Sequence, residues 1–218
     1  CSTGIMAADA TLRYGTASAG FTQLILGATF PVGLIITVLT GAELFTGDAM
    51  LAPMAAFVHK ISWMSVINLW IWVYIGNFIG SVWYAYLMAN GPFVSWDNTG
   101  AVAVTAFGTR AIAIAVAKTS YFGTAGMWSA FLKAIGCNWL LNLAILLGIC
   151  ADDLIAKFFG IWFPIMAFVS SGFEHSIANM YFIPAGLFVT GIDPSKAVST
   201  LSWTTLFTSN LIIVTIGN

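Results

Sequence analysis

The chain has 218 residues, of which 60% are hydrophobic and only 7% are charged, and its formal net charge is −1. Its mean hydropathy of +0.94 excludes a soluble domain, because so much apolar surface cannot be kept from water. The sequence has no run of basic or acidic residues, so neither a nucleic acid nor a charged protein surface is expected as a partner. We therefore expect an integral membrane protein that lies in a lipid bilayer.

The first elements are a polar segment and a broken helix. Residues 1–18 are mixed and polar, whereas residues 19–39 are apolar enough to form a membrane helix. We expect this helix to break at residues 40–47. A second half-helix should begin at Asp48, as its N-cap, and end within residues 53–60.

The rest of the chain alternates between apolar runs and one long connection. Residues 91–126 are rich in alanine and carry several polar residues, so we expect an ordered connection with an interfacial helix at residues 111–118. The apolar runs are expected to be membrane spans. They are residues 61–88, 127–150, 155–187 and 201–218, and the third of them is broken at residues 170–172.

Two segments, 131 positions apart, share one pattern. Residues 41–53 and 172–184 both read G-x-E-x-x-x-x-[DN]-x-x-x-x-P, and V-x-I-G-N follows each, at residues 73–77 and 214–218. Only about a dozen apolar residues precede the second break, too few to cross a hydrocarbon core of roughly 30 Å. Both breaks should therefore lie near the middle of the membrane.

The two related helices should run in opposite directions, because two spans separate them, and the repeat is then inverted. We expect an all-α polytopic membrane protein with two broken helices, forming one transmembrane domain over residues 1–218. Its first half covers about residues 19–90 and its second half about residues 127–218. Residues 1–18 cannot supply a partner for the span at 127–150, so we expect a sequence that lacks its first helix and the end of its last one.

The shared pattern places one carboxylate in each broken helix. A carboxylate in hydrocarbon costs several kcal/mol unless it is paired, so Glu43 and Glu174 indicate a transport site at the breaks. A bare carboxylate would repel an anion, and we expect both to pair with a cation or to orient a neighbour. His175 follows Glu174, and Asn179 lies one helical turn further on.

The breaks and their polar residues allow two other functions, a channel for neutral solutes and a membrane enzyme. An aquaporin-type channel for neutral solutes expects Asn-Pro-Ala at each half-helix, and neither break has this motif. A membrane enzyme with Glu174 and His175 as an acid/base pair lacks an activated nucleophile and a cluster of metal ligands. An isolated histidine in an apolar span is more often a packed core residue than a functional one.

Three motifs are longer and more specific. They are L-T-G-A-E-L-F-T-G at residues 39–47, K-A-I-G-C-N-W-L-L at residues 133–141 and S-G-F-E-H-S-I-A-N-M at residues 171–180. Together they resemble the formate/nitrite transporter family. The resemblance implies an aquaporin-like inverted repeat of six helices, a homopentamer in the cell (plasma) membrane, one pore per protomer, and neither an enzymatic activity nor a cofactor or metal. The implied cargo is a small monovalent anion, formate first and nitrite or hydrosulfide next, with protons involved.

The resemblance also implies roles for individual residues. His175 would be the central pore histidine, and Lys133, near the outer end of its span, would attract the anion. The implied pore residues are Phe30, Leu141 and Phe168 with Asn138 at an outer narrowing, and Leu34, Leu44 and Phe45 with Thr46 and Asn218 at an inner one. For the apolar residues, helix packing is the alternative role. Thr46 could instead be a backbone cap.

The expected mechanism follows from the cost of moving a charge through a dry constriction. A small carboxylate crosses more easily once it is protonated or neutralised. His175 could supply this help, because an imidazole changes charge near neutral pH. Movement of an anion, of a neutral acid and of an anion with a proton all remain open.

Overall fold

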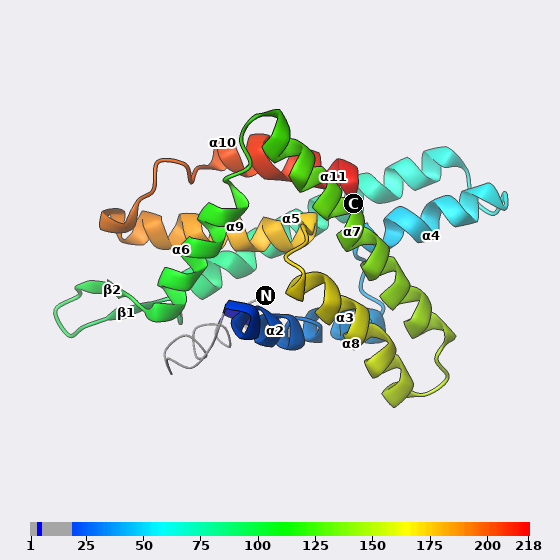
Figure 1. Ribbon diagram of the computed structural model, residues 1–218, viewed down its shortest axis with the longest axis horizontal. Helices are drawn as coiled ribbons and strands as arrows, with labels where there is room; N and C mark the ends of the chain where they lie inside the picture. Colours follow the sequence, from blue (N-terminus) through cyan, green and yellow to red (C-terminus); the bar gives the residue numbers. More distant parts are fainter. Residues whose placement is uncertain (1–3, 6–18) are drawn as a thin grey trace.

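The computed structural model describes residues 4–5 and 19–218 (Figure 1), so the expectation for residues 1–18 lies almost wholly outside the described residues. The described residues are mostly helical, as the all-α prediction requires. The helices are α2 (Ala19–Thr29), α3 (Val32–Thr40), α4 (Phe45–Phe57), α5 (Trp63–Asn90), α6 (Ala106–Lys118), α7 (Gly123–Cys150), α8 (Leu154–Ser170), α9 (Ser176–Ile192), α10 (Trp203–Leu206) and α11 (Ile212–Gly217). A π-helical turn, η2 (Phe207–Leu211), joins the last two, and η1 (Pro194–Lys196) is a 3₁₀ turn.

Three helices in the described part of the chain are long and apolar enough to cross a membrane. They are Gly20–Thr40, which contains α2 and α3, Trp63–Asn90 and Gly123–Cys150. Shorter apolar helices follow at Leu154–Ser170, Ser176–Ile192 and Trp203–Gly217. The predicted polytopic helical architecture is confirmed.

Helix α9 forms the centre of the molecule and is buried along most of its length. Helices α5 and α6 pack along it (Figure 1). The close approach of α6 depends on small residues, because a Cβ atom on Gly186 would lie 2.4 Å from the Cβ of Ala115. This packing brings the end of α6 to the start of α9, where the second break lies.

Both predicted breaks exist, at residues 41–44 and 171–175. Each contains a glycine in the left-handed region, with φ of 70° at Gly41 and 69° at Gly172, a conformation that favours glycine. The N–H after each glycine bonds to the carbonyl five residues earlier, at 3.0 Å in the first break and 3.2 Å in the second. The two helices thus end in the same way.

The asparagine that ends each V-x-I-G-N motif makes hydrogen bonds to the backbone of one break. Asn77 accepts the N–H of Phe45 at 3.0 Å and donates to the carbonyl of Glu43 at 3.2 Å. Asn218 makes the same two bonds, at 2.7 Å with the N–H two residues after Glu174 and at 3.1 Å with the Glu174 carbonyl. This shared pattern supports the repeat that we infer from the sequence, and its inversion stays a prediction.

The starts of the half-helices differ from the prediction in the first repeat. Leu44 is the N-cap of α4 and Phe45 its first residue, so the expectation that Asp48 is the N-cap is wrong. Asp48 lies one turn inside the helix because the asparagine clamp already fixes the N–H of Phe45. Helix α8 has 17 residues rather than a dozen, yet at 1.5 Å per residue it reaches only about 25 Å, still less than the hydrocarbon core.

The connection at residues 91–126 also differs from the prediction. It begins with an antiparallel hairpin, β1 (Val94–Trp96) and β2 (Val102–Val104). The expected helix at residues 111–118 exists but is longer, because these residues belong to α6, which buries Ala111 and Ala115 against the core. The alanines that suggested a weakly apolar surface helix are the residues that permit close helix packing.

Candidate functional site

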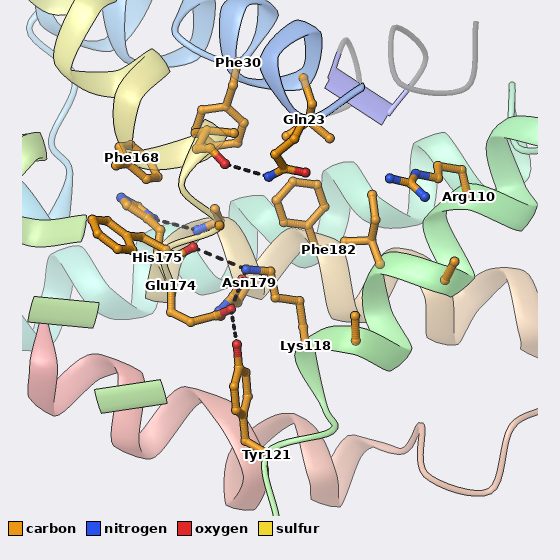
Figure 2. Close-up of a pocket in the computed structure, with 18 residues that line it drawn as sticks. Gln23, Phe30, Arg110, Lys118, Tyr121, Phe168, Glu174, His175, Asn179 and Phe182 are labelled. Carbon is orange, nitrogen blue, oxygen red and sulfur yellow. Dashed lines mark hydrogen bonds and ion pairs between the residues drawn. The ribbon is translucent and has the colours of Figure 1, made fainter. Parts of the chain in front are cut away.

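Two cavities meet at the second break. The first has a volume of about 300 Å³ and lies among α2, α6, α8 and α9 (Figure 2). The second has a volume of about 400 Å³ and lies among α3, α5, α7, α8 and α9. The residues that line both are Phe30, Phe168, His175 and Ala178. The imidazole and two phenyl rings therefore stand between the two cavities.

His175 connects the two breaks. It is the N-cap of α9, since its Nδ1 accepts the N–H of Ala178 at 2.9 Å, and its Nε2 lies 3.2 Å from the hydroxyl of Thr46. An Nδ1 that accepts a hydrogen bond carries no proton, so the proton of the neutral ring is assigned to Nε2. At the first break, the N-cap of α4 is Leu44, and the hydroxyl of Thr46 contacts His175.

Aromatic rings surround the imidazole. The ring of His175 stacks on Phe168, with centroids 5.9 Å apart and planes at 18°. Phe30 meets Phe168 edge-on at 5.8 Å and stacks on Phe182 at 6.3 Å. These contacts form an apolar barrier in which a bare ion would lose its hydration shell.

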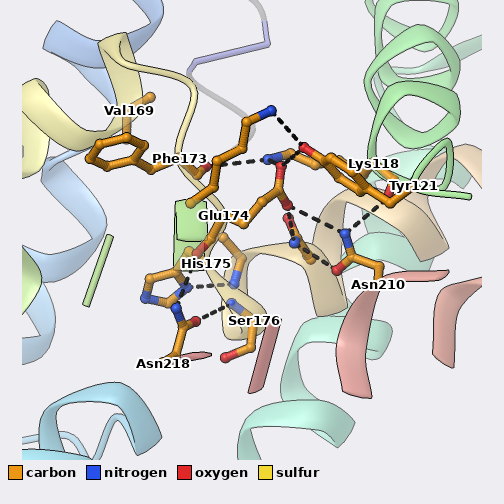
Figure 3. A network of polar contacts seen from close by, with 12 residues as sticks. Lys118, Tyr121, Val169, Phe173, Glu174, His175, Ser176, Asn210 and Asn218 are labelled. Carbon is orange, nitrogen blue, oxygen red and sulfur yellow. Dashed lines mark hydrogen bonds and ion pairs between the residues drawn. The ribbon is translucent and has the colours of Figure 1, made fainter. Parts of the chain in front are cut away.

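Glu174 is 1% exposed, and four donors surround its carboxylate. Oε1 accepts from Lys118 at 2.7 Å and from the hydroxyl of Tyr121 at 2.8 Å. Oε2 accepts from the amides of Asn179 at 2.7 Å and Asn210 at 3.3 Å. Figure 3 shows Glu174 near Lys118, Tyr121 and Asn210. A buried carboxylate is tolerated when its lone pairs are satisfied in this way.

Asn210 is a member of this network that the sequence analysis missed. It lies in the π-helical turn η2, donates to the backbone carbonyl of Lys118 at 2.8 Å and accepts from Asn179 at 2.7 Å. Single π turns inside α-helices occur frequently at functional sites. The only signal in the sequence was the polar run at residues 208–210 inside an apolar span.

The cation next to the second break is Lys118 rather than Lys133. Lys118 lines the first cavity, whereas Lys133 lines neither cavity. The ammonium of Lys133 lies 3.1 Å from the hydroxyl of Tyr121 and 5.1 Å from the centroid of the Tyr121 ring. The role of Lys133 in attracting the anion stays a prediction, and the lysine that the packing of α6 on α9 brings to the carboxylate is Lys118.

The apolar residues expected at two separate narrowings divide differently in the structure. Leu141, expected at the outer one, lines the second cavity together with Leu34 and Leu44. Phe45 lines neither cavity and packs edge-on against Tyr74, with centroids 5.0 Å apart. Its ring turns toward α5 because the residue begins α4 on the far side of the break.

The remaining polar residues lie beside the cavities. The amide nitrogen of Asn138 donates to the backbone carbonyl of Asn218, so these two residues lie together and not at opposite narrowings. Asn218 reaches Asn138 because its side chain clamps the second break. Glu43 is exposed, next to Asp48, and lines neither cavity. Within residues 4–5 and 19–218, no group of three His, Cys, Asp or Glu side chains could hold a metal ion.

Several membrane helices, two of them broken, and a buried imidazole between two cavities are the features of a helical membrane channel or transporter. Comparison with known proteins gives the family. The chain belongs to the formate/nitrite transporter family, whose sequence profile matches residues 1–218.

Individual relatives agree with this assignment. A probable formate transporter of Methanothermobacter thermautotrophicus is 42% identical over 212 residues, which are 92% of this chain and 71% of that protein. The formate channel BtFdhC of Bacillus thuringiensis is 38% identical over 193 residues, 88% of this chain and 66% of that protein. A solved pentameric formate channel with formate bound superimposes with a TM-score of 0.80 at 29% identity, covering 99% of this chain and 86% of that one. These relatives are channels and transporters, not enzymes.

Proposed function

We propose that this protein conducts small monovalent anions across the cell membrane, with formate as its first substrate and nitrite or hydrosulfide as alternatives. The observation that carries the proposal is the position of His175 between two cavities, in contact with Thr46 of the other break. Formate appears in the names of the relatives, and one solved relative is a pentamer. We accordingly propose a homopentamer of multi-pass protomers, each with its own pore.

The proposed path runs from the first cavity, past the rings of Phe30 and Phe168, into the second. The Lys118–Glu174 pair at the first cavity is neutral as a whole and would leave the anion free to reach the imidazole. Leu34, Leu44 and Leu141 would form the apolar wall beyond it. An anion inside this barrier is stable only if a donor replaces part of its hydration shell.

His175 can supply that donor in two ways. As a neutral ring it offers its Nε2 proton to an anion oxygen, in exchange for the hydrogen bond with Thr46. A second proton on Nδ1 would break the bond with the N–H of Ala178 and create an imidazolium that neutralises the anion. Transfer of the Nε2 proton from that imidazolium would give formic acid and return a neutral ring.

The experiment compares fluxes of radiolabelled formate and nitrite into proteoliposomes for the parent protein and two variants. His175→Phe removes both the donor and the N-cap, whereas His175→Asn keeps an N-cap of about 1 kcal/mol and removes the titration. We expect pH-dependent flux for the parent protein and loss of the pH dependence in both variants. His175→Asn should retain the thermal stability that His175→Phe loses.

Two outcomes would contradict the proposal. Identical pH profiles in all three proteins would remove His175 from the mechanism while leaving the channel intact. A parent protein that carries no formate, nitrite or hydrosulfide, despite correct folding in the vesicles, would overturn the function itself.

A further inference from the structure

Arg110 is a charged residue of the first cavity that the proposed mechanism does not use. It lies on α6, eight residues before Lys118, and lines the cavity with Ala113, Ile114 and Ala117. These residues form one face of the helix. Lys118 ends α6 next to the second break, and Arg110 lies about two turns before it, farther from His175.

Among the residues that the structure describes, the guanidinium of Arg110 has no counter-charge. Its Nε atom is buried without a hydrogen-bond partner, and the ion pair found among residues 4–5 and 19–218 is Lys118–Glu174. Figure 2 shows the guanidinium turned toward the side of Gln23 and Phe182. The amide nitrogen of Gln23 is held by the carbonyl of Val169 at 2.7 Å. Arg110 therefore presents an uncompensated charge to the cavity.

Within the described part of the chain, the charged residues that line the first cavity are Arg110, Lys118 and Glu174. Lys118 and Glu174 lie 2.7 Å apart and cancel, which leaves the positive charge of Arg110. A cavity with apolar walls and a net positive charge concentrates anions, because such walls screen the field less than water does. Arg110 supplies the attraction that the neutral Lys118–Glu174 pair lacks.

We propose that Arg110 forms a separate binding position for planar oxyanions in the first cavity, where formate or nitrite is held before it reaches His175. A guanidinium donates two parallel hydrogen bonds to the two oxygens of a carboxylate or of nitrite. Hydrosulfide has a single acceptor atom and cannot use this fork. The inference rests on the proposed function and adds a determinant of selectivity to it.

Flux measurements on three variants test the proposal. Arg110→Gln removes the charge, Arg110→Lys keeps the charge without the fork, and Lys196→Gln, at an exposed position that lines neither cavity, is the control for net charge. We expect Arg110→Gln to raise the half-saturating concentration of formate roughly tenfold. For formate, Arg110→Lys should reverse less than half of the effect of Arg110→Gln on the half-saturating concentration. For hydrosulfide, it should reverse nearly all of the effect of Arg110→Gln. Lys196→Gln should match the parent protein.

Equal half-saturating concentrations in the parent protein and Arg110→Gln would overturn the proposal. So would complete recovery of formate affinity in Arg110→Lys, because the fork would then contribute nothing. If the parent protein carries formate and the Arg110 variants behave like it, this inference fails alone. If the parent protein carries none of the three anions, the proposed function fails.

A binding measurement does not depend on flux or on a variant of Arg110. The sequence has two arginines, Arg13 and Arg110, so an Arg13→Lys protein leaves one guanidinium for phenylglyoxal to modify. Formate and nitrite should slow the modification of Arg110, measured by mass spectrometry, at least several-fold more than hydrosulfide at the same concentration. Equal rates with and without formate would overturn the proposal.

Discussion

Glu174 is next to His175 in the chain, yet its carboxylate is bonded to a separate network of donors. The four donors come from α6, η2, α9 and the segment before α7. Such pairing would allow the proposed anion path to contain a carboxylate, because Lys118 neutralises its charge. If the carboxylate is removed, the ammonium of Lys118 is left without its counter-charge.

Changing Glu174 alone should therefore be harmful. Glu174→Gln leaves Lys118 without its counter-charge, and we expect a loss of about 3 kcal/mol of stability, seen as a lower apparent unfolding temperature in detergent micelles. The double variant Lys118→Met/Glu174→Gln should regain a substantial part of this loss, since no charge stays unpaired. Lys196→Met, at an exposed position, is the control. Additive losses in the double variant would show that the pair is not coupled.

The sequence indicated some members of this site and not others. Glu174, His175 and Asn179 are near one another in the chain, so their helical spacing was sufficient to group them. Lys118 and Asn210 lie 56 and 36 residues from Glu174, and only the packing of α6 and η2 against α9 brings them there. Lys133 was expected, from the family resemblance, to attract the anion, and the sequence named no partner for the Glu174 carboxylate.

At the level of elements, each break depends on one glycine and one asparagine. A left-handed conformation costs a residue with a Cβ atom about 1–2 kcal/mol. An added Cβ atom at Gly41 or Gly172 meets no atom within 4 Å, so the backbone conformation alone decides the cost of a substitution there.

Alanine at these two glycines should consequently have the same effect. We expect Gly41→Ala and Gly172→Ala each to lower stability by about 1 kcal/mol, and asparagine at either position to be better tolerated than alanine. Gly76→Ala is the matched control, since Gly76 lies within α5, also without an atom within 4 Å of an added Cβ. This control should be neutral or stabilising. Thermal unfolding of the purified variants measures all five changes, and no difference between Gly41→Ala and Gly76→Ala would contradict the role of the left-handed conformation.

The helical runs and both breaks were predictable, because long apolar segments and the repeated glycine pattern are local signals. The start of α4 was misplaced by three residues, since Asn77, 32 positions away, and not Asp48 fixes the first N–H. The length of α6 was underestimated for a similar reason. Its alanines have little hydrophobicity of their own and are buried only because Gly186 admits them.

On the scale of the whole molecule, the two cavities predict access from opposite sides of the membrane. Ala113 lines the first cavity and Ser81 the second, so each can be replaced by cysteine in a protein whose Cys1, Cys137 and Cys150 are changed to serine. A membrane-impermeant thiosulfonate reagent should label Ala113→Cys from one side of oriented vesicles and Ser81→Cys from the other. Labelling of both from the same side would contradict the proposed path.

A small contact between α5 and α11 has a wider consequence. The hydroxyls of Tyr74 and Thr215 lie 3.0 Å apart, and both residues are second in V-x-I-G-N. Where two related helices touch at corresponding positions of the repeat, each side chain meets the residue at the equivalent position of the other half. The two equivalent positions must therefore hold side chains that can bond to each other. A hydroxyl meets this requirement because it both donates and accepts, whereas two lysines or two aspartates would repel each other. Neither position can change its polarity independently of the other, although 141 residues separate them.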